Sequence, residues 1–328
     1  MGSILEVDGL RIWVASGQGP VLIVDDLHLK VDAGTVHGLA GESGSGKSIS
    51  AQSLIGILPE QFVQEGTITL DGRTVGPRGD VGFDVIRGPE ISMIFQDPLN
   101  SLHPQIKIGR QLTEHAGRRH GQDSRRAHAR ALELLKEVRI PDPDWTMKAY
   151  PHQFSGGMRQ RIAVAMALVG DPKVLIADEP TTALDVTVQA GVLALLRRLC
   201  TERDLAVILI THDLGVMHAM ADDLTIMYAG RVVENGRGKE VLRAPRHPYT
   251  QQLIKALPKG PQRGAERQMT MVAIKGEPAT PRNRPRGCAF HPRCPYVEPG
   301  CSDAVPELVA RTSDRLVACP VDPLAEGK

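Results

Sequence analysis

Residues 41–48 form a glycine-rich segment whose residue types and spacing suit the binding of a phosphate chain. Its sequence, GESGSGKS, fits the pattern G-x-x-x-x-G-K-S/T at every position. Glycines let the backbone curl so that successive N–H groups point at phosphate oxygens, and a helix that begins near Lys47 adds its positive dipole end. In such a loop Lys47 reaches the β- and γ-phosphates, and the Ser48 hydroxyl ligates Mg²⁺. The predicted ligands of a nucleoside triphosphate are Gly41, Ser43, Gly44, Ser45, Gly46, Lys47, Ser48 and Ile49.

A carboxylate pair, Asp178 and Glu179, follows the apolar run VLIA at 174–177. Asp178 is placed to hold Mg²⁺, directly or through water, and Glu179 to polarise a water molecule that attacks the phosphate. The alternative is a pair of solvated charges at the end of a strand. The phosphate-binding pattern in the same chain favours the catalytic interpretation.

The segment SGGMRQR at 155–161 predicts a second anion site. Ser155 is a good N-cap, and Gly156 and Gly157 expose backbone N–H groups at the start of the helix that follows. An ordinary capped helix is the alternative, but two glycines weaken a first turn unless something must approach closely. One chain with two γ-phosphate sites is unusual, unless the second site serves a nucleotide held by another chain.

These groups need a scaffold in which strands end beside the starts of helices. Short apolar runs alternate with helical patterns, which predicts strands buried on both faces of a mostly parallel sheet. The expected strands are 5–14, 21–31, 36–41, 66–75, 91–95, 173–178, 205–211 and a hairpin at 224–236; the expected helices are 47–58, 186–204, one from about 215, and others in a helical region at about 98–170. Within that region, Ala131, Leu134, Leu135 and Val138 recur at helical spacing.

Bulk composition limits the class of protein. The chain has 328 residues, of which 41% are hydrophobic and 3% aromatic, so a globular core must be mainly aliphatic. The formal net charge of +1 gives no general field for nucleic acid, and no nucleic-acid partner is expected. No apolar run reaches the roughly 20 residues of a membrane span, and we find no secretory signal. We therefore expect a cytosolic chain that meets a membrane only through a partner.

The composition changes after residue 257. Residues 258–287 hold five Pro, four Gly, and seven basic against two acidic residues, which predicts an irregular linker or wrapping arm. The tail at 288–328 contains Cys288, Cys294, Cys301 and Cys319. In a reducing compartment this clustering suggests metal binding more than disulfides, and four thiolates suit structural Zn²⁺ or an iron–sulfur cluster. His291 is either a further ligand or an ordinary loop residue.

Taken together, these motifs resemble those of the ATPase subunits of ABC transporters. FSGGMRQR is similar to the signature sequence of that family, and the order and spacing of the motifs match from about residue 4 to 240. Gln96 is similar to the Q-loop glutamine, Ala183-Leu184-Asp185 to the D-loop, and His212 to the switch histidine. A lone Gln or a lone His after a strand is a weak signal, but each gains meaning in this order.

The resemblance implies an α/β fold: a P-loop NTPase core with an antiparallel β subdomain, a helical subdomain and a small cysteine-rich C-terminal extension. The nucleotide-binding domain would span 1–257. The resemblance also implies a head-to-tail dimer, in which the signature of one subunit acts on the ATP of the other. The implied catalytic residues are Lys47, Gln96, Glu179 and His212; the implied Mg²⁺ ligands are Ser48, Gln96 and Asp178; and the implied signature residues are Ser155, Gly156, Gly157 and Gln160.

Recognition of adenine is one point where the chain departs from the family pattern. The family usually stacks adenine on an aromatic residue near the end of the first strand. This chain has Val14 there, with Trp13 one position away. Trp13 either takes this role through a local bulge or is a packed core residue.

MIFQDPLNSLHP at 93–104 and HPYTQQLIKALP at 247–258 resemble the di- and oligopeptide importer branch, whose ATPase subunits bind a 4Fe–4S cluster through a four-cysteine extension. The resemblance implies this cluster here, with Zn²⁺ and unmetallated thiols as alternatives. It also implies peptide uptake at the cytoplasmic face of the cell (inner) membrane, through two transmembrane permease subunits, an extracytoplasmic solute-binding protein and a related second ATPase subunit. The segment after Gln96 and the helical region would contact the permeases.

Three alternatives stay open at this point. The ATPase dimer is either a heterodimer with a related chain or a homodimer. The cargo of importers in the same branch includes nickel, opines, oligosaccharides and glutathione, and an ATPase subunit does not touch cargo. A soluble ABC ATPase that acts on DNA or ribosomes is disfavoured, because the chain has neither a second ATPase domain nor a long coiled-coil insertion.

Overall fold

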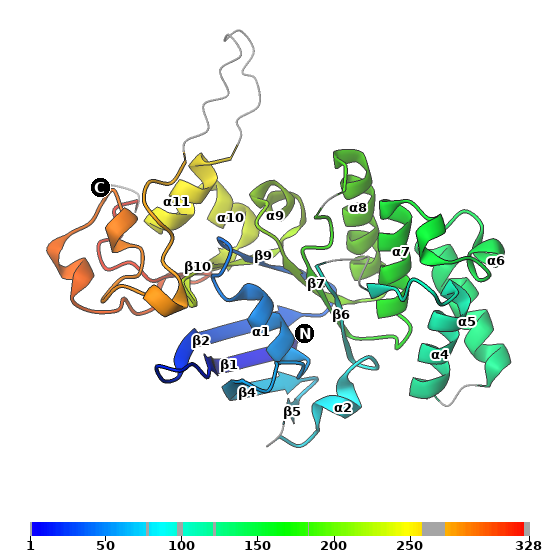
Figure 1. The fold of residues 1–328 in the computed structure, drawn as a ribbon. Coiled ribbons are helices and arrows are strands. Elements are labelled where there is room, and N and C mark those ends of the chain that lie inside the picture. Colours follow the sequence, from blue (N-terminus) through cyan, green and yellow to red (C-terminus); the bar gives the residue numbers. More distant parts are fainter. Residues whose placement is uncertain are drawn as a thin grey trace, which may run out of the picture.

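A computed structural model describes residues 2–76, 79–96, 101–120, 123–182, 184–257 and 273–324. Its first sheet is antiparallel and has the strand order β2-β1-β4-β5 (Figure 1). The strands are β1 (Ser3–Val14), β2 (Val21–Asp32), β4 (Phe62–Leu70) and β5 (Arg73–Val75). Asp71 and Gly72 join β4 to β5 with positive φ values of 49° and 74°, as the Asp-Gly turn requires. The predicted antiparallel β subdomain is confirmed.

The second sheet has eight strands in the order β11-β12-β10-β9-β3-β8-β7-β6. Its central strands β9, β3, β8, β7 and β6 are parallel, as predicted. Their bounds are β3 (Val36–Ala40), β6 (Ile91–Ile94), β7 (Val174–Asp178), β8 (Ala206–Ile210) and β9 (Asp223–Tyr228). Every residue of β3, β7 and β8 is buried, because helices and the antiparallel sheet cover both faces.

The remaining strands of this sheet include two that the sequence analysis did not predict. Strand β10 (Arg231–Arg237) forms the expected hairpin with β9. The tail then adds β12 (Arg315–Val317) to the far edge of β10, and β11 (Val309–Thr312) to β12. These strands have three and four residues and no clear alternation, so no local pattern indicates them. The cysteine-rich extension is therefore continuous with the core sheet.

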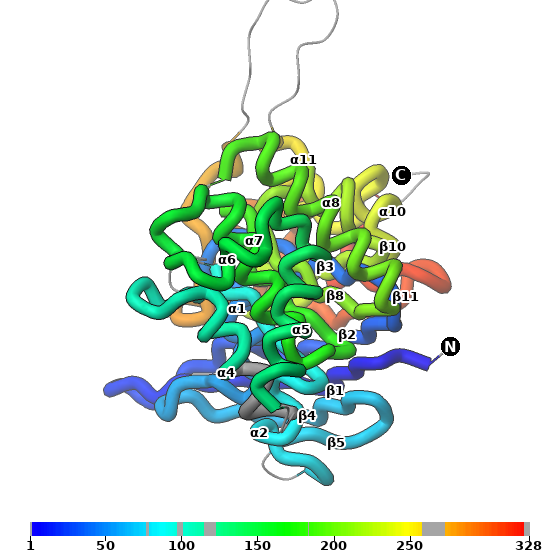
Figure 2. The backbone as a smooth tube through the Cα atoms, turned by 90° about the vertical axis from the view of Figure 1, so that its right-hand side faces the viewer, coloured from blue at the N-terminus to red at the C-terminus, as the bar shows by residue number. Residues whose placement is uncertain are grey.

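Helices surround this framework, and α4 to α7 group at one end of the molecule. They lie on the right of Figure 1, opposite the extension, and in front in Figure 2. Ala131, Leu134, Leu135 and Val138 are buried there, as their spacing predicts. The helices are α1 (Lys47–Leu54), α2 (Phe83–Ile86), α4 (Ile108–His120), α5 (Ser124–Glu137), α6 (Pro143–Thr146), α7 (Gly156–Ala167), α8 (Val186–Glu202), α9 (Leu214–Met220), α10 (Gly238–Arg243) and α11 (Pro248–Lys255).

Helix α1 ends at Leu54, four residues before the predicted end at 58. Gly56 adopts a φ of 64°, the left-handed conformation that commonly terminates a helix. In the parts of the chain that the structure describes, no helix is both long and apolar enough to cross a membrane.

Candidate functional site

The phosphate loop, residues 41–48, connects buried strand β3 to helix α1. Gly46 is the N-cap of α1 and has a φ of 103°, a conformation that favours glycine. At Gly41, a Cβ atom would lie 2.2 Å from the carbonyl oxygen of Met227 on β9. The loop thus needs glycine both to turn into the helix and to pass close to the neighbouring strand.

Lys47 is buried and folds back over this loop. Its Nζ donates hydrogen bonds to the carbonyl oxygens of Gly41, at 2.8 Å, and Glu42, at 2.9 Å. Burial lowers the pKa of Lys47, while the carboxylates of Glu179, Asp178 and Glu42 act in the opposite direction. Phosphate oxygens of a nucleotide would give this ammonium group stronger partners than the carbonyl groups it now contacts.

The Ser48 hydroxyl and Asp178 lie together at the start of α1 and the end of β7. Ser48 Oγ donates a hydrogen bond of 3.2 Å to Asp178 Oδ1. Asp178 is 4% exposed, and this burial raises its pKa. A hydroxyl and a carboxylate are hard oxygen donors, which fit Mg²⁺, and the buried carboxylate gains a positive partner when the ion binds.

Glu179 is the centre of a hydrogen-bonded network formed by three separate segments. Its carboxylate accepts hydrogen bonds from Gln96 Nε2, at 3.0 Å, and Thr182 Oγ1, at 2.9 Å, and lies 3.0 Å from His212 Nδ1. Burial alone would raise the pKa of Glu179, but the hydrogen bonds from His212 and Thr182 and the charge of Lys47 lower it overall. Glu179 is therefore held as a carboxylate, the form that can accept a proton from water. Sequence analysis did not identify Thr182.

The backbone of Glu179 is unusual for a non-glycine residue. Its φ is 46°, and its N–H donates a hydrogen bond of 2.8 Å to the Ile210 carbonyl oxygen at the end of β8. Strained conformations of this kind cluster at functional sites, where surrounding structure maintains them. In this conformation the carboxylate lies within hydrogen-bonding distance of Gln96 and His212.

A cavity of about 410 Å³ brings the phosphate loop together with this network. Eight of the predicted residues line it, namely Ser43, Gly44, Gly46, Lys47, Ser48, Ile49, Gln96 and Glu179. Ile23 on β2 and the segment 280–282 of the C-terminal extension also line it, and sequence analysis identified neither. Among the described residues that form its wall, neither Trp13 nor Val14 is present.

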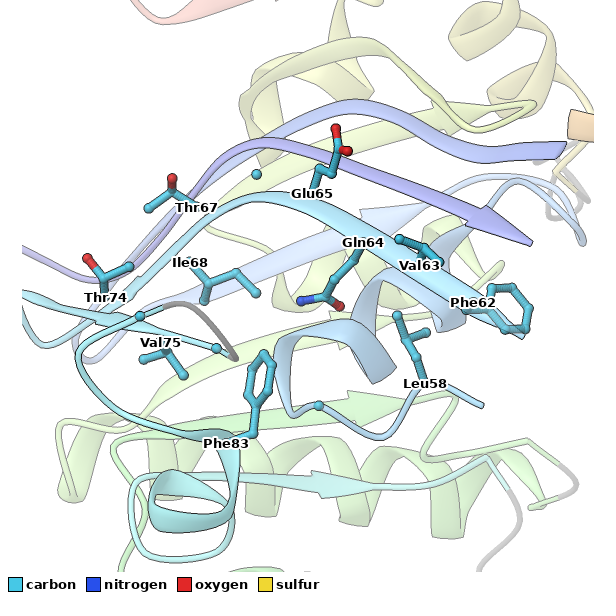
Figure 3. A pocket seen from close by; sticks show the side chains of 14 residues that line it. Leu58, Phe62, Val63, Gln64, Glu65, Thr67, Ile68, Thr74, Val75 and Phe83 are labelled. Carbon is cyan, nitrogen blue, oxygen red and sulfur yellow. The ribbon is translucent and has the colours of Figure 1, made fainter. Parts of the chain in front are cut away.

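A larger cavity, of about 710 Å³, is present elsewhere in the described part of the chain. It is formed between β4, β5 and the loop after α1, with Leu58, Phe62 and Phe83 around it (Figure 3). None of the described residues that line it was predicted to do chemistry. Size alone therefore does not identify the functional site of this chain.

The signature segment, residues 155–161, leads into helix α7. It does not appear in the described lining of the 410 Å³ cavity beside the phosphate loop, which we call the nucleotide cavity. The Ser155 side chain caps the helix by accepting a hydrogen bond from the Met158 N–H at 3.4 Å. Gly157 is buried, and a Cβ atom there would lie 2.2 Å from Val188 Cγ1 on α8. The close approach that requires glycine at position 157 therefore comes from a neighbouring helix of the same chain.

Gln160, another predicted signature residue, differs from Ser155 in its exposure. Its side chain is fully buried, and its amide atoms have no hydrogen-bond partner among the described residues. The contact of Gln160 with a nucleotide of another subunit stays a prediction. Ser155, in contrast, is exposed.

The D-loop residues lie beside the signature. Ala183 falls outside the described residues. Leu184 Cδ2 would lie 3.3 Å from a Cβ atom at Gly156, and the Asp185 side chain caps α8 by accepting a hydrogen bond of 2.9 Å from the Val188 N–H. Helices α7 and α8 thus begin next to each other.

The four tail cysteines line one small pocket although they span 32 positions from first to last. Burial raises the pKa of Cys288 and Cys319, and raises that of Cys294 to about 11. His291 also lines the pocket, but its Nδ1 lies 2.9 Å from the Cys288 carbonyl oxygen. Within the described ranges, no three or more His, Cys, Asp or Glu side chains are arranged to hold a metal ion.

The fold and the nucleotide cavity define this chain as an ATPase of the ABC class. Residues 24–182 match the family described as ABC transporter. A solved structure of cbiO1 from Clostridium perfringens, part of an ABC transporter complex, aligns with a TM-score of 0.62 and 27% identity, over 74% of this chain and 92% of that one. The dimeric bacterial ABC transporter cassette MJ0796 shares the fold, with a TM-score of 0.61 and 24% identity, over 71% and 98% of the two chains.

A narrower family is defined by relatives that match almost the whole chain. The oligopeptide transport ATP-binding protein OppD of Salmonella typhimurium is 44% identical over 98% of this chain and 95% of its own length. AppD of Bacillus subtilis, also an oligopeptide transport ATP-binding protein, is 41% identical over 97% of this chain and 97% of its own length. Residues 233–301 match the oligopeptide/dipeptide transporter C-terminal region. The chain belongs to the family of oligopeptide and dipeptide transport ATP-binding proteins.

Proposed function

We propose that this chain hydrolyses ATP to energise the uptake of di- and oligopeptides through transmembrane permease subunits, at the cytoplasmic face of the cell membrane. The observation that carries the proposal is the match of both the ATPase core and the C-terminal region to peptide transport ATP-binding proteins. An extracytoplasmic solute-binding protein would deliver the peptide, as the resemblance of the C-terminal region to oligopeptide and dipeptide transporters implies.

The geometry around Glu179 supports a direct route for hydrolysis. Glu179 accepts a proton from a water molecule as that water attacks the γ-phosphorus, and the bond from this phosphorus to the β-phosphate oxygen breaks. Lys47 stabilises the negative charge that develops on the departing ADP. Ser48 and Asp178 would hold Mg²⁺, which would supply charge neutralisation to the phosphates when bound. His212 and Gln96 orient the carboxylate.

A second ATPase subunit would complete this site. The exposed Ser155 and the adjacent glycine N–H groups form an anion site that the chain's own nucleotide cavity does not use among its described lining residues. A head-to-tail arrangement places this site against the γ-phosphate of a neighbouring subunit. We expect a related chain as the partner, and a homodimer is the alternative.

We propose that the permease subunits dock beside Gln96. A groove of about 240 Å³ lies between β6 and α7 and is lined by Ile57, Met93, Phe95 and Met166, among others. Phe95 is 43% exposed, which is unusual for an aromatic side chain, and it directly precedes Gln96. A permease segment seated here would be coupled to the Glu179 network through the adjacent residue.

Co-purification from native membranes tests the transporter proposal. We expect wild-type chain to bring down two permease subunits and a second ATPase subunit. Phe95→Asp should lose the permeases while it still binds ATP. Val63→Asp is a matched control, since Val63 is 62% exposed but lies on β4, away from the groove. If Phe95→Asp retains the permeases as wild type does, the proposed docking place is wrong; if wild type brings down ribosomes instead, the transporter proposal fails.

We also propose that Cys288, Cys294, Cys301 and Cys319 bind a 4Fe–4S cluster. Their convergence on one pocket supports a shared ligand, and the ligand would remove the cost of burying thiolates there. Four thiolates suit either a single Zn²⁺ ion or an iron–sulfur cluster. The match of residues 233–301 to the oligopeptide/dipeptide transporter C-terminal region, the branch that the four-cysteine extension resembles, favours the cluster.

Metal analysis of anaerobically purified protein distinguishes the two ligands. We expect brown protein with about four iron and four sulfide per chain. Cys200→Ser should leave this content unchanged, because Cys200 lies buried in α8, and Cys319→Ser should reduce it. Colourless protein with stoichiometric zinc, or with no metal, would reject the cluster.

A further inference from the structure

Three consecutive residues of the C-terminal extension line the nucleotide cavity. Thr280, Pro281 and Arg282 share this cavity with Ile23, the phosphate loop and Glu179. Pro281 and Arg282 belong to a short 3₁₀ turn, Pro281–Asn283, that packs against β2. The extension therefore reaches back across the core to the site where ATP binds.

The position of this segment is fixed by contacts on either side of it. The Ala279 N–H donates a hydrogen bond of 3.0 Å to the Tyr228 hydroxyl. Arg284, which is 12% exposed, donates from Nε to the Ala229 carbonyl oxygen at 2.8 Å and from Nη2 to the Leu22 carbonyl oxygen at 3.2 Å. Since Leu22 precedes Ile23, the hydrogen bonds of Arg284 place residues 280–282 directly beside Ile23, the residue of β2 that lines the cavity.

The side chain of Arg282 has no evident structural task in this position. It is exposed, and among the described residues it has no hydrogen bond or ion pair, whereas the neighbouring Arg284 has several. A cation held at a cavity wall without an internal partner is available to a ligand.

The other groups in the cavity leave one part of a nucleotide without partners. The phosphate loop and Lys47 hold the triphosphate, and Gln96 and Glu179 lie at the hydrolytic end. Ile23 and the segment 280–282 remain for the ribose and base. No aromatic side chain is present among the described residues of the wall, so a stacking surface for the base must come from another group.

We propose that residues 280–282 form the base-side wall of the nucleotide site, with the planar guanidinium of Arg282 stacking on the purine beside Ile23. Guanidinium groups stack on aromatic faces, and such contacts contribute measurably when they are partly shielded from water. The inference rests on the nucleotide-binding part of the proposed function. It assigns the extension a direct role in nucleotide recognition, in addition to any ligand of its cysteines.

Equilibrium binding to the full-length chain with Mg²⁺ tests this role, with ATP and inorganic tripolyphosphate as the two probes. Arg282→Ala should weaken ATP binding by about 5- to 30-fold and leave tripolyphosphate binding unchanged. Arg282→Lys keeps the positive charge but removes the planar guanidinium group, so the affinity for ATP should still fall. Arg286→Ala is the matched control: Arg286 is an exposed arginine of the same segment that does not appear in the described cavity wall.

Each other outcome overturns the inference in a distinct way. Unchanged ATP affinity in Arg282→Ala excludes contact with the base. An equal loss for ATP and tripolyphosphate places Arg282 on the phosphates instead, and full rescue by Arg282→Lys shows that charge alone matters. If wild-type chain binds neither probe, the proposed nucleotide site itself fails, which is separate from any defect caused by Arg282→Ala.

Discussion

Replacement of Arg293 by methionine should loosen the phosphate loop, although Glu42 of that loop lies 251 positions away from Arg293 in the sequence. Arg293 lies between two of the tail cysteines, and its side chain is 4% exposed. Its guanidinium donates to both Glu42 carboxylate oxygens, at 2.7 and 3.1 Å, and to the Tyr228 hydroxyl at 3.1 Å. Glu42 is the second residue of the phosphate loop, and its carbonyl oxygen accepts a hydrogen bond from Lys47.

The expected loss of unfolding free energy follows from how deeply the side chains of Arg293 and Glu42 are buried. Removal of one partner from a fully buried pair costs about 3–5 kcal/mol, because the other charge remains without compensation. The Glu42 side chain is 23% exposed, so water relieves part of that cost, and the Tyr249 hydroxyl still accepts a hydrogen bond from the Glu42 N–H. We expect Arg293→Met to lose about 2–3 kcal/mol of unfolding free energy. Methionine retains the aliphatic volume that packs beside Tyr228 and Phe290.

A double-mutant cycle isolates the ion pair from other effects of the substitution. Urea unfolding and ATP affinity would be measured for wild type, Arg293→Met, Glu42→Gln and the double variant. We expect a coupling free energy above about 1 kcal/mol in stability, because the two residues are in direct contact. We also expect weaker ATP binding in Arg293→Met. Strictly additive losses, or wild-type ATP affinity in a destabilised Arg293→Met, would refute the idea that this pair positions the loop.

Two further predictions concern the signature and Glu179, the proposed catalytic carboxylate. Gly157→Ala should destabilise the chain by about 1–3 kcal/mol, because the added methyl group clashes with Val188. A second substitution, Val188→Ala, should restore part of this lost stability, as measured by thermal unfolding. If no stability is recovered, the packing explanation is wrong. The pKa of Glu179 is lowered, so its contribution to stability and activity is present above the ordinary glutamate pKa of about 4.3 and is lost as pH falls through the lower folded value. Removal of a hydrogen bond to the carboxylate in Thr182→Val should therefore move the acid limb of the ATPase pH profile upward, and an unmoved limb would contradict this assignment.

The chemical groups of the site were predictable because each is set by local sequence. The loop at 41–48 follows a buried strand and precedes a helix, and the pair Asp178 and Glu179 ends another buried strand. Parallel strands place their carboxyl ends along one edge, so groups that follow β3, β7 and β8 come together there. The fold class follows from the same alternation of buried strands and helices.

Contacts that join distant parts of the chain were not predictable in this way. Residues 280–282 lie in a stretch that composition describes only as irregular, yet Arg284 fixes them against Leu22 and Ala229. The ion pair of Arg293 with Glu42 has no local signal, because neither residue belongs to a periodic pattern. Glycine at position 157 was interpreted as a sign that a ligand approaches closely, and the contact with Val188 on α8, which has no local signal, gives a second reason for glycine there.

ATP turnover by Glu179→Gln tests most directly the central claim, that this chain is an ATPase whose hydrolysis depends on Glu179. Glutamine keeps the shape of the side chain and removes the carboxylate that accepts the proton. In the complex purified from membranes, we predict bound ATP equal to that of wild type and turnover reduced by about 10²- to 10⁴-fold. Turnover comparable to wild type at equal ATP occupancy would contradict the account.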